Sequence, residues 1–301
     1  MQPLDLQSLN ETFAITNQVA FAAGPGGLAF AEVRNRHASA TISTYGAQIL
    51  SFQPHDQQPV LWRSAHSYYQ QGKAIRGGVP ICWPWFGPHP TDPSKPSHGF
   101  ARTAAWRVLA TAALADGATQ IRLRLRDSEA TYELWPHSFD VRAVITVGPQ
   151  LRVELIARNY GDTPYTFGGA LHSYFAVADV GAISIRGLED HEYIDQLDGQ
   201  RKTQHGPITI AGETDRVYLA STETCVIDDP GMARRISIAK SGSRSTVVWN
   251  PWIEKAQRLA DFGDDEYREM VCIETANALD DSVTVAPGGE HRLVAMIGVE
   301  S

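Results

Sequence analysis

Apolar and polar residues alternate at every second position in many short segments of this chain. In the clearest case, Ile121 to Arg126, isoleucine and leucine alternate with three arginines. A period of two places successive side chains on opposite faces of a β-strand, so we expect these arginines on the solvent face. Gly and Pro residues separate the segments, which is typical of antiparallel sandwiches and barrels.

Eight further segments predict strands, and one predicts a short helix. Phe139–Val147 and Leu151–Arg158 are joined by a turn at Gly148 to Gln150. The other predicted strands are Ala182–Arg186, Arg235–Ala239, Thr246–Trp249, Met270–Ile273, Ser282–Val285 and Arg292–Ile297. Apolar residues at helical spacing predict a helix over Trp252–Phe262. We therefore expect an all-β, antiparallel β-sandwich with few short helices, as a single domain over residues 1–301.

Composition excludes several function classes. The net charge of −8 argues against nucleic-acid binding, which relies on a basic surface. No apolar run approaches the roughly 18 residues of a membrane span, and the polar, acidic segment Met1 to Phe13 predicts no signal peptide. The three cysteines, Cys82, Cys225 and Cys272, have no CxxC spacing, so we expect neither disulfides nor a zinc site. A reducing, cytoplasmic location fits this cysteine usage best.

One segment, Arg76 to Pro90, is dense in Gly, Pro and aromatic residues. Proline lacks a backbone donor, so this segment cannot be a central strand throughout. It predicts a rigid loop that presents the rings of Trp83, Trp85 and Phe86. These rings either plug the core or form the wall of a binding site, and the sequence leaves both readings open.

Three ionisable residues stand in apolar, strand-like surroundings: His98, His172 and Glu274. Burying such groups is costly unless they are paired, so their presence suggests acid–base catalysis. Taken singly, each could also be a satisfied structural residue. Metal catalysis is disfavoured because no His-x-His or His-Glu-x-x-His pattern occurs. The chain also lacks the Gly-x-Ser-x-Gly elbow of hydrolases and a phosphate-binding P-loop.

Two arginines, Arg76 and Arg102, flank the aromatic loop. A guanidinium presents a planar two-pronged donor that suits phosphate oxygens. Surface ion pairs are the alternative role for either residue.

The combination of motifs resembles the hexose-6-phosphate mutarotases, also called glucose-6-phosphate 1-epimerases, of the aldose 1-epimerase superfamily. The resemblance runs from about Thr41 to Val299. It rests on motifs in matching order: Arg76-Gly-Gly-Val-Pro, Trp83-Pro-Trp-Phe-Gly, His98-Gly-Phe-Ala-Arg102, Leu171-His172-Ser-Tyr-Phe and Val248-Trp-Asn-Pro-Trp-Ile-Glu-Lys255.

This resemblance implies a galactose-mutarotase-like β-sandwich (supersandwich) with the sugar bound on a sheet face. It implies His172 as general acid and Glu274 as general base. The resemblance further implies that the substrate contacts Arg76, His98, Arg102 and Asp195. We add Trp83 from the aromatic loop, and Ser97, which stands where a relative carries a substrate-contacting Gln and could act through a water.

The function expected from the resemblance is interconversion of the α and β anomers of a hexose 6-phosphate, with D-glucose 6-phosphate as the first candidate. The enzyme would be an isomerase that needs no cofactor and no metal. Two alternatives stay open: an aldose 1-epimerase acting on unphosphorylated sugars, and a non-catalytic sugar-binding or sensor protein. We expect a monomer whose partner is the phosphosugar alone, with no nucleic-acid or membrane partner.

Overall fold

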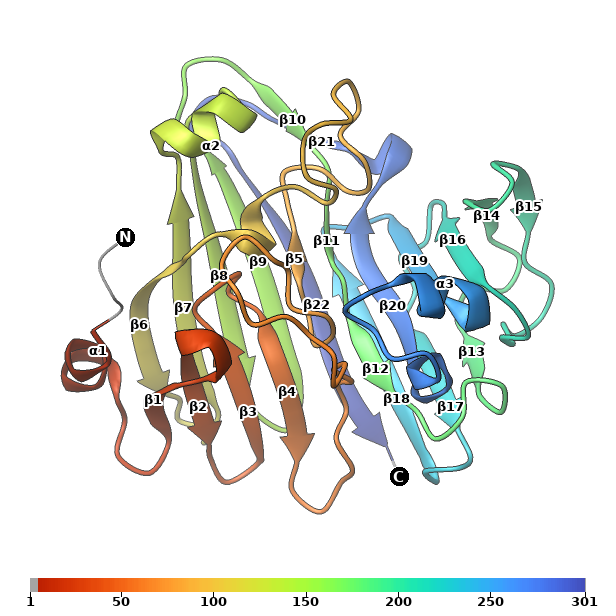
Figure 1. Cartoon of the computed structure of the whole chain (residues 1–301), viewed down its shortest axis with the longest axis horizontal. Helices are drawn as coiled ribbons and strands as arrows, with labels where there is room; N and C mark the ends of the chain where they lie inside the picture. Colours follow the sequence, from red (N-terminus) through yellow and green to blue (C-terminus); the bar gives the residue numbers. More distant parts are fainter. Residues whose placement is uncertain (1–4, 301) are drawn as a thin grey trace.

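The computed structural model describes residues 5–300, and the paired strands in it are antiparallel. They form two eight-stranded sheets, one four-stranded sheet and one two-stranded sheet (Figure 1). The predicted all-β class is confirmed. Residues 1–4 and 301 of the expected 1–301 domain lie outside the described residues, and its organisation as a single domain stays a prediction.

The first eight-stranded sheet contains most of the strands that alternate strictly in sequence. Its order is β13-β17-β18-β22-β9-β8-β7-β6. In chain order these strands are β6 (Arg107–Ala113), β7 (Thr119–Arg126), β8 (Phe139–Val147), β9 (Leu151–Asn159), β13 (Ser184–Arg186), β17 (Cys225–Asp229), β18 (Arg234–Ser241) and β22 (Glu290–Glu300). In β7 the isoleucine and leucine side chains are buried and the arginines are exposed or half-buried, as the pattern predicts.

The second eight-stranded sheet carries the residues of interest for function. Its order is β15-β14-β16-β19-β20-β11-β5, and β12 also pairs with β20. The strands are β5 (Ile81–Cys82), β11 (Gly169–Leu171), β12 (Tyr174–Ala176), β14 (Glu192–Asp195), β15 (Arg201–Thr203), β16 (Thr214–Tyr218), β19 (Ser245–Asn250) and β20 (Met270–Asn277). The Pro-rich segment therefore contributes only the two-residue strand β5.

The remaining strands and the helices lie around these sheets. The four-stranded sheet consists of β1 (Val19–Ala23), β2 (Ala29–Arg34), β3 (Ala38–Ser43) and β4 (Ile49–Pro54), and the two-stranded sheet of β10 (Tyr165–Phe167) and β21 (Val283–Val285). The α-helices are α1 (Leu6–Phe13), α2 (Glu129–Leu134) and α3 (Trp252–Arg258). No helix within residues 5–300 is long and apolar enough to cross a membrane.

The predicted helix over Trp252–Phe262 is shorter than expected. Helix α3 ends at Arg258 because Leu259 takes an extended backbone conformation and caps the helix through its own N–H, which donates to the carbonyl of Ala256. The chain then turns, and Phe262 packs its ring against Trp62 with the ring centroids 5.0 Å apart. The apolar spacing continues past the helix end because Leu259 is half-buried and Phe262 is buried there, in a turn.

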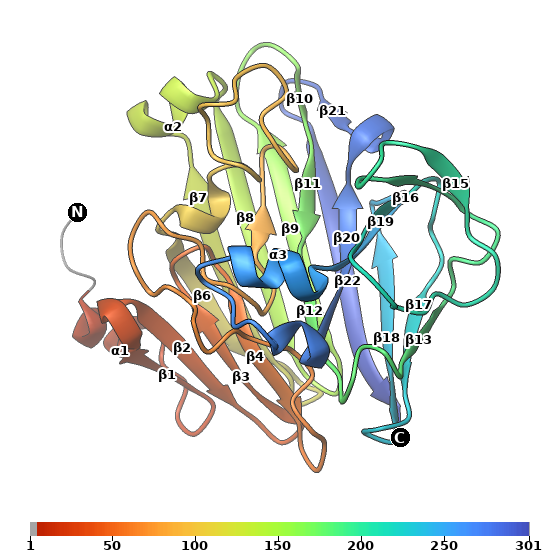
Figure 2. The ribbon, with the colours of Figure 1, turned by 45° about the vertical axis from the view of Figure 1, so that its right-hand side comes forward.

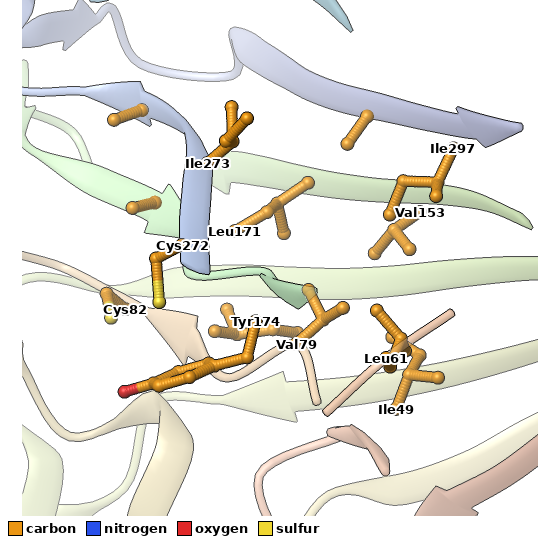
Figure 3. Packing of buried hydrophobic residues seen from close by; sticks show 14 of the residues in the cluster. Ile49, Leu61, Val79, Cys82, Val153, Leu171, Tyr174, Cys272, Ile273 and Ile297 are labelled. Carbon is orange, nitrogen blue, oxygen red and sulfur yellow. The ribbon is translucent and has the colours of Figure 1, made fainter. Parts of the chain in front are cut away.

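The hydrophobic core lies between the two large sheets. Figure 3 shows Ile273 of β20 gathered with Val153 of β9 and Ile297 of β22, and Figure 2 shows β20 and β22 lying close together in the ribbon. Since side chains alternate along a strand, the neighbours of Ile273, which are Cys272 and Glu274, point to the opposite face of the second sheet. That opposite face carries the candidate site.

Candidate active site

Three adjacent strands of the second sheet line a cavity with alternate residues. Val217 of β16 pairs with Val247 of β19, which pairs with Glu274 of β20. Two residues along the strands, Asp215 pairs with Trp249. Directly paired residues share a sheet face, and all five line a cavity of about 610 Å³.

Loops from distant parts of the sequence close this cavity. The segment between β5 and β6 supplies most of the loop side, and the residue after β14, Gln196, supplies another part. Helix α3 adds a lysine. The lining residues outside the sheet include Arg76, Phe86, Ser97, His98, Arg102, His172, Gln196 and Lys255. Six of the eight residues predicted for the site from sequence, Glu274 among them, therefore meet around one cavity.

His172 and Glu274 face each other at the bottom of the cavity. The Nε2 atom of His172 lies 3.4 Å from Oε1 of Glu274, and their side chains are only 9% and 1% exposed. The His172 ring stacks on Tyr174 at a centroid distance of 4.7 Å and an interplanar angle of 8°. His172 Nδ1 and Glu274 Oε2 have no hydrogen-bond partner within residues 5–300. One buried polar atom of each group is therefore left unpaired by the described residues.

Burial pushes both members of this pair toward their uncharged forms. It lowers the pKa of His172 well below its ordinary value, and the nearby His98 and the positive charges of Arg102 and Arg76 act in the same direction. Burial and the nearby Asp215 raise the pKa of Glu274 well above its ordinary value. This is the reverse of the raised pKa that would help His172 act as an acid. Both directions favour an uncharged imidazole beside a protonated carboxyl group over an ion pair.

His98 enters the cavity from a strained turn. Its φ of 64° lies in the left-handed region, and the following Gly99 has φ 72°. A Cβ atom at Gly99 would lie 2.1 Å from the carbonyl oxygen of Trp83, so only glycine fits there. The Nδ1 atom of His98 accepts a hydrogen bond from the N–H of Gly87 at 3.3 Å. The neutral ring therefore carries its proton on Nε2, where it can act as a donor.

The pH dependence of stability provides a test of this buried histidine. Burial, with the charges of Arg102 and Arg76, lowers the pKa of His98 to about 3. Below the ordinary value of about 6.5 the unfolded chain binds a proton that the folded chain does not, so stability falls as pH falls. The free energy of unfolding should fall as the pH is lowered from about 6 to about 4.5. We expect this slope to be smaller in His98→Gln than in wild type, by up to about 1.4 kcal/mol per pH unit.

Urea unfolding curves across this pH range measure that slope. His205→Gln, a substitution at an exposed histidine outside the cavity, serves as the matched control. Equal slopes for wild type and His98→Gln would contradict a histidine that is kept neutral by burial.

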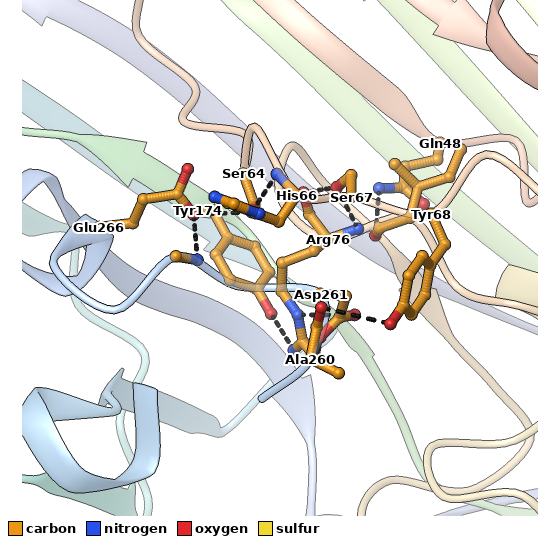
Figure 4. A network of polar contacts seen from close by, with 12 residues as sticks. Gln48, Ser64, His66, Ser67, Tyr68, Arg76, Tyr174, Ala260, Asp261 and Glu266 are labelled. Atoms are coloured by element: carbon orange, nitrogen blue, oxygen red, sulfur yellow. Dashed lines mark hydrogen bonds and ion pairs between the residues drawn. The ribbon is translucent and has the colours of Figure 1, made fainter. Parts of the chain in front are cut away.

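Arg76 is held from two sides (Figure 4). Its Nη2 and Nε atoms donate to the two carboxylate oxygens of Asp261 at 2.9 and 3.2 Å, and Nη1 donates to the hydroxyl of Tyr174 at 3.2 Å. A carboxylate thus already neutralises this arginine. Tyr174 connects it to the catalytic pair, because the same tyrosine ring stacks on His172.

Arg102 is less constrained than Arg76. It lies in a 3₁₀ turn, Ala101–Thr103, and its Nη2 donates to the main-chain carbonyl of Ser97 at 2.9 Å. No carboxylate oxygen among residues 5–300 lies within 4.0 Å of its guanidinium nitrogens. Arg102 is therefore the arginine of the cavity whose charge is open to an anionic ligand.

The structure places Trp83 away from the cavity. Its side chain is fully buried and packs edge-on against Phe100, Trp135 and Phe139, with ring centroids 4.7 to 5.8 Å apart. Trp83 belongs to the core because it follows strand β5 directly, where side chains pack between the sheets. The aromatic rings that line the cavity are Phe86 of the same loop and Trp249 of β19.

Asp195 also does not line the cavity. It pairs with Arg216, the residue between Asp215 and Val217, and therefore shares the opposite face of the sheet. Its carboxylate binds Lys202 Nζ at 2.7 Å. Besides Glu274, the acidic residue that the sheet presents to the cavity is Asp215. Sequence reasoning missed it, although an aspartate inside a β-strand is an uncommon choice that could have singled it out.

Asp215 is one member of a charged cluster at the cavity wall. Lys255 of α3 lies 3.5 Å from Asp215 and 2.9 Å from Glu213, and its Nζ stands 5.9 Å from the ring centre of Trp249. Burial raises the pKa of Asp215, and Lys255 lowers it in part. The cluster places a carboxylate, an ammonium group and an indole ring side by side, which suits a ligand with hydroxyl groups and an apolar face.

The fold is shared with solved structures of one class. A structure from Salmonella typhimurium, described provisionally as a mutarotase, superposes with a TM-score of 0.90 at 33% identity and covers 96% of each chain. A galactose mutarotase related enzyme from Lactobacillus acidophilus has a TM-score of 0.73 at 16% identity, covers 90% of this chain and 97% of its own, and shows the fold alone. Together with the buried acid–base pair, this defines an enzyme with a galactose-mutarotase-like β-sandwich.

Sequence comparison gives the family. Residues 31–297 match the sequence model of the aldose 1-epimerase family. A protein of Cenchrus ciliaris is 35% identical over 285 residues, which are 89% of this chain and 84% of its own length. A protein of Escherichia coli K12 is 37% identical over 241 residues, 79% of this chain and 80% of its own. The chain belongs to the aldose 1-epimerase family, as its motifs predicted; both relatives are provisionally named glucose-6-phosphate 1-epimerases.

Proposed function

We propose that this protein interconverts the α and β anomers of a hexose 6-phosphate, D-glucose 6-phosphate in the first place. The observation that carries the proposal is one cavity that joins an acid–base pair, His172 and Glu274, to an arginine without a carboxylate partner, Arg102. The names of the Cenchrus ciliaris and Escherichia coli relatives agree with this substrate.

The chemistry needs two proton transfers and no covalent intermediate. One group takes the proton of the O1 hydroxyl while another protonates the ring oxygen O5, and the C1–O5 bond breaks to give the open aldehyde. Rotation about C1–C2 presents the other carbonyl face, and the reverse transfers close the ring. Positioned acids and bases each contribute about 10²–10⁴-fold to such a reaction.

A pair that holds one proton suits this reaction. Ring opening takes one proton from the pair and returns one to it, so the total is conserved. We assign Glu274 as base and His172 as acid. The arginine charges that lower the pKa of His172 are those of Arg102 and Arg76. A phosphate dianion beside them would offset this effect and favour the protonated histidine that the assignment needs.

The remaining lining residues would orient the sugar. His98 can donate from Nε2 to a sugar oxygen, and Ser97 can reach a hydroxyl directly or through a water. We propose Asp215 and Trp249, in place of Asp195 and Trp83, as the acidic and aromatic contacts, because the first two line the cavity and the other two do not.

Anomer exchange of glucose 6-phosphate, followed by magnetisation-transfer NMR with and without protein, tests the proposal. We expect exchange faster than the spontaneous rate, with a smaller effect on glucose. Equal acceleration of both sugars would favour the unphosphorylated-sugar epimerase. Binding without acceleration at any pH between about 6 and 8 would favour a sugar sensor and overturn the proposal.

We also propose that the protein works as a monomer in the cytoplasm. All three cysteines are buried free thiols, which fits a reducing compartment. Size-exclusion chromatography with light scattering tests the oligomeric state.

A further inference from the structure

A buried cysteine lies beside the catalytic pair. The ligand-type atoms of His172, Cys272 and Glu274 (an imidazole nitrogen, the thiol sulfur and a carboxylate oxygen) all lie within 4.8 Å of one another. It is the one such group of three found within residues 5–300. Neither the proposed mechanism nor the sequence motifs assign any role to Cys272.

The strand geometry explains why these three groups meet. Cys272 and Glu274 are two residues apart on β20, so their side chains leave the same face of the sheet. Cys272 pairs with Tyr174 of β12 on one side and with Trp249 of β19 on the other. Tyr174 in turn stacks on the His172 ring. The thiol therefore lies on the same sheet face as Glu274, next to the pair.

The three groups together are the ligand types that zinc prefers. Zn²⁺ takes thiolate sulfur, imidazole nitrogen and carboxylate oxygen at about 2.0 to 2.3 Å, and sites with three protein ligands keep a fourth position open. Tetrahedral ligands at those lengths lie roughly 3.3 to 3.8 Å apart. His172 and Glu274 are already 3.4 Å apart. A side-chain shift of about an ångström at most would complete the triangle.

Two further observations point to a ligand at this position. Glu274 Oε2 is a buried atom without a hydrogen-bond partner within the described residues. Buried polar atoms are rarely left unpaired, so each such atom calls for an explanation. His172 and Glu274 also line the cavity, which leads from solvent to the pair and leaves room for the fourth, open position.

We propose that His172, Cys272 and Glu274 form a three-ligand Zn²⁺ site, and that Zn²⁺ bound there inhibits the enzyme. The inhibition rests on the proposed function; the metal site does not. Binding turns the Cys272 thiol into a thiolate and the Glu274 carboxyl group into a carboxylate, and it releases both protons to the buffer. The metal then occupies the lone pairs with which Glu274 and His172 would exchange protons with the sugar, so substrate and Zn²⁺ exclude each other.

Metal binding is tested with Co²⁺, a spectroscopic substitute for Zn²⁺. We expect the wild-type protein to develop thiolate-to-cobalt charge-transfer absorption that excess Zn²⁺ abolishes. Cys272→Ala should lack this band, whereas Cys225→Ala, which removes a buried thiol from strand β17 of the other large sheet, should keep it. A band in Cys272→Ala equal to that of wild type, or no band in wild type, would overturn the proposal.

Inhibition is tested on anomer exchange of glucose 6-phosphate. Zn²⁺ should inhibit wild type reversibly, with activity restored by a chelator, and Mg²⁺, which prefers oxygen ligands, should not inhibit. Cys272→Ala should keep the basal activity and require at least about tenfold more Zn²⁺, since loss of even an outer partner costs metal sites 10- to 100-fold in affinity. Unchanged Zn²⁺ sensitivity in Cys272→Ala would overturn the proposal that Zn²⁺ inhibits by binding at this site. If wild type accelerates no anomer exchange, the proposed function fails, and the Co²⁺ spectra still decide the metal site.

Discussion

Glu274→Gln should slow catalysed anomer exchange of glucose 6-phosphate by about 10²–10⁴-fold. The amide has the shape of the carboxyl group but cannot take or give the proton that ring opening moves. The substitution leaves the cavity lining otherwise intact, so the sugar should still bind. Magnetisation-transfer NMR measures the rate, and calorimetric titration with glucose 6-phosphate measures binding.

The matched control is Glu154→Gln. Glu154 is a buried glutamate of β9, ion-paired with Arg152 and Arg292, and it does not line the cavity. We expect near wild-type exchange in this variant. A Glu274→Gln variant that keeps more than about a tenth of the wild-type rate acceleration would remove Glu274 from the role of reacting group.

Arg102→Ala should raise the KM for glucose 6-phosphate by roughly 10- to 100-fold, because a hydrogen bond to a charged group contributes about 1.5–3 kcal/mol. The activity on unphosphorylated glucose should change little. Arg102 has no carboxylate within 4.0 Å among residues 5–300 and bonds only a main-chain carbonyl, so its loss should leave stability almost unchanged. Exchange rates at several concentrations of each sugar give the KM values.

Two comparison variants sharpen this test. Arg186→Ala removes an exposed arginine of β13, outside the cavity, and should leave both KM values unchanged. Arg76→Ala should also lower the free energy of unfolding, by about 1–3 kcal/mol, because it leaves the Asp261 carboxylate and the Tyr174 hydroxyl without their partner. If Arg102→Ala impaired glucose and glucose 6-phosphate equally, Arg102 would not be the residue that distinguishes the phosphate.

The strands could be predicted wherever one face is buried and the other meets solvent. Phe139–Val147 is observed with the predicted bounds, and Leu151–Arg158 extends by one residue to Asn159. The four-stranded sheet was not predicted, because β2 begins with three buried residues in a row and β1 is short and rich in alanine. Such segments lack the period of two that identifies a strand.

The reacting pair could be proposed from sequence because a buried histidine or glutamate in a β-rich chain calls for an explanation. The residues that form the wall of the cavity could not be proposed from sequence, because they depend on strand register. A shift of one residue decides whether Asp195 joins Asp215 on the cavity face or lies on the opposite face, and nothing in the local sequence fixes how β14 pairs with β16. For the same reason the sequence could not show that Trp83 packs into the core while Trp249 lines the cavity.

The alternation along β16, β19 and β20 separates the residues that meet a ligand from those that hold the sheets together. Val247 and Glu274 line the cavity, whereas Val248 and Ile273, their neighbours on β19 and β20, are core residues that do not line it. Substrate preference can therefore drift, or be engineered, by exchanging every second residue while the intervening residues preserve the fold. An insertion of one residue in any of the three strands would exchange the two sets and lose specificity and stability together.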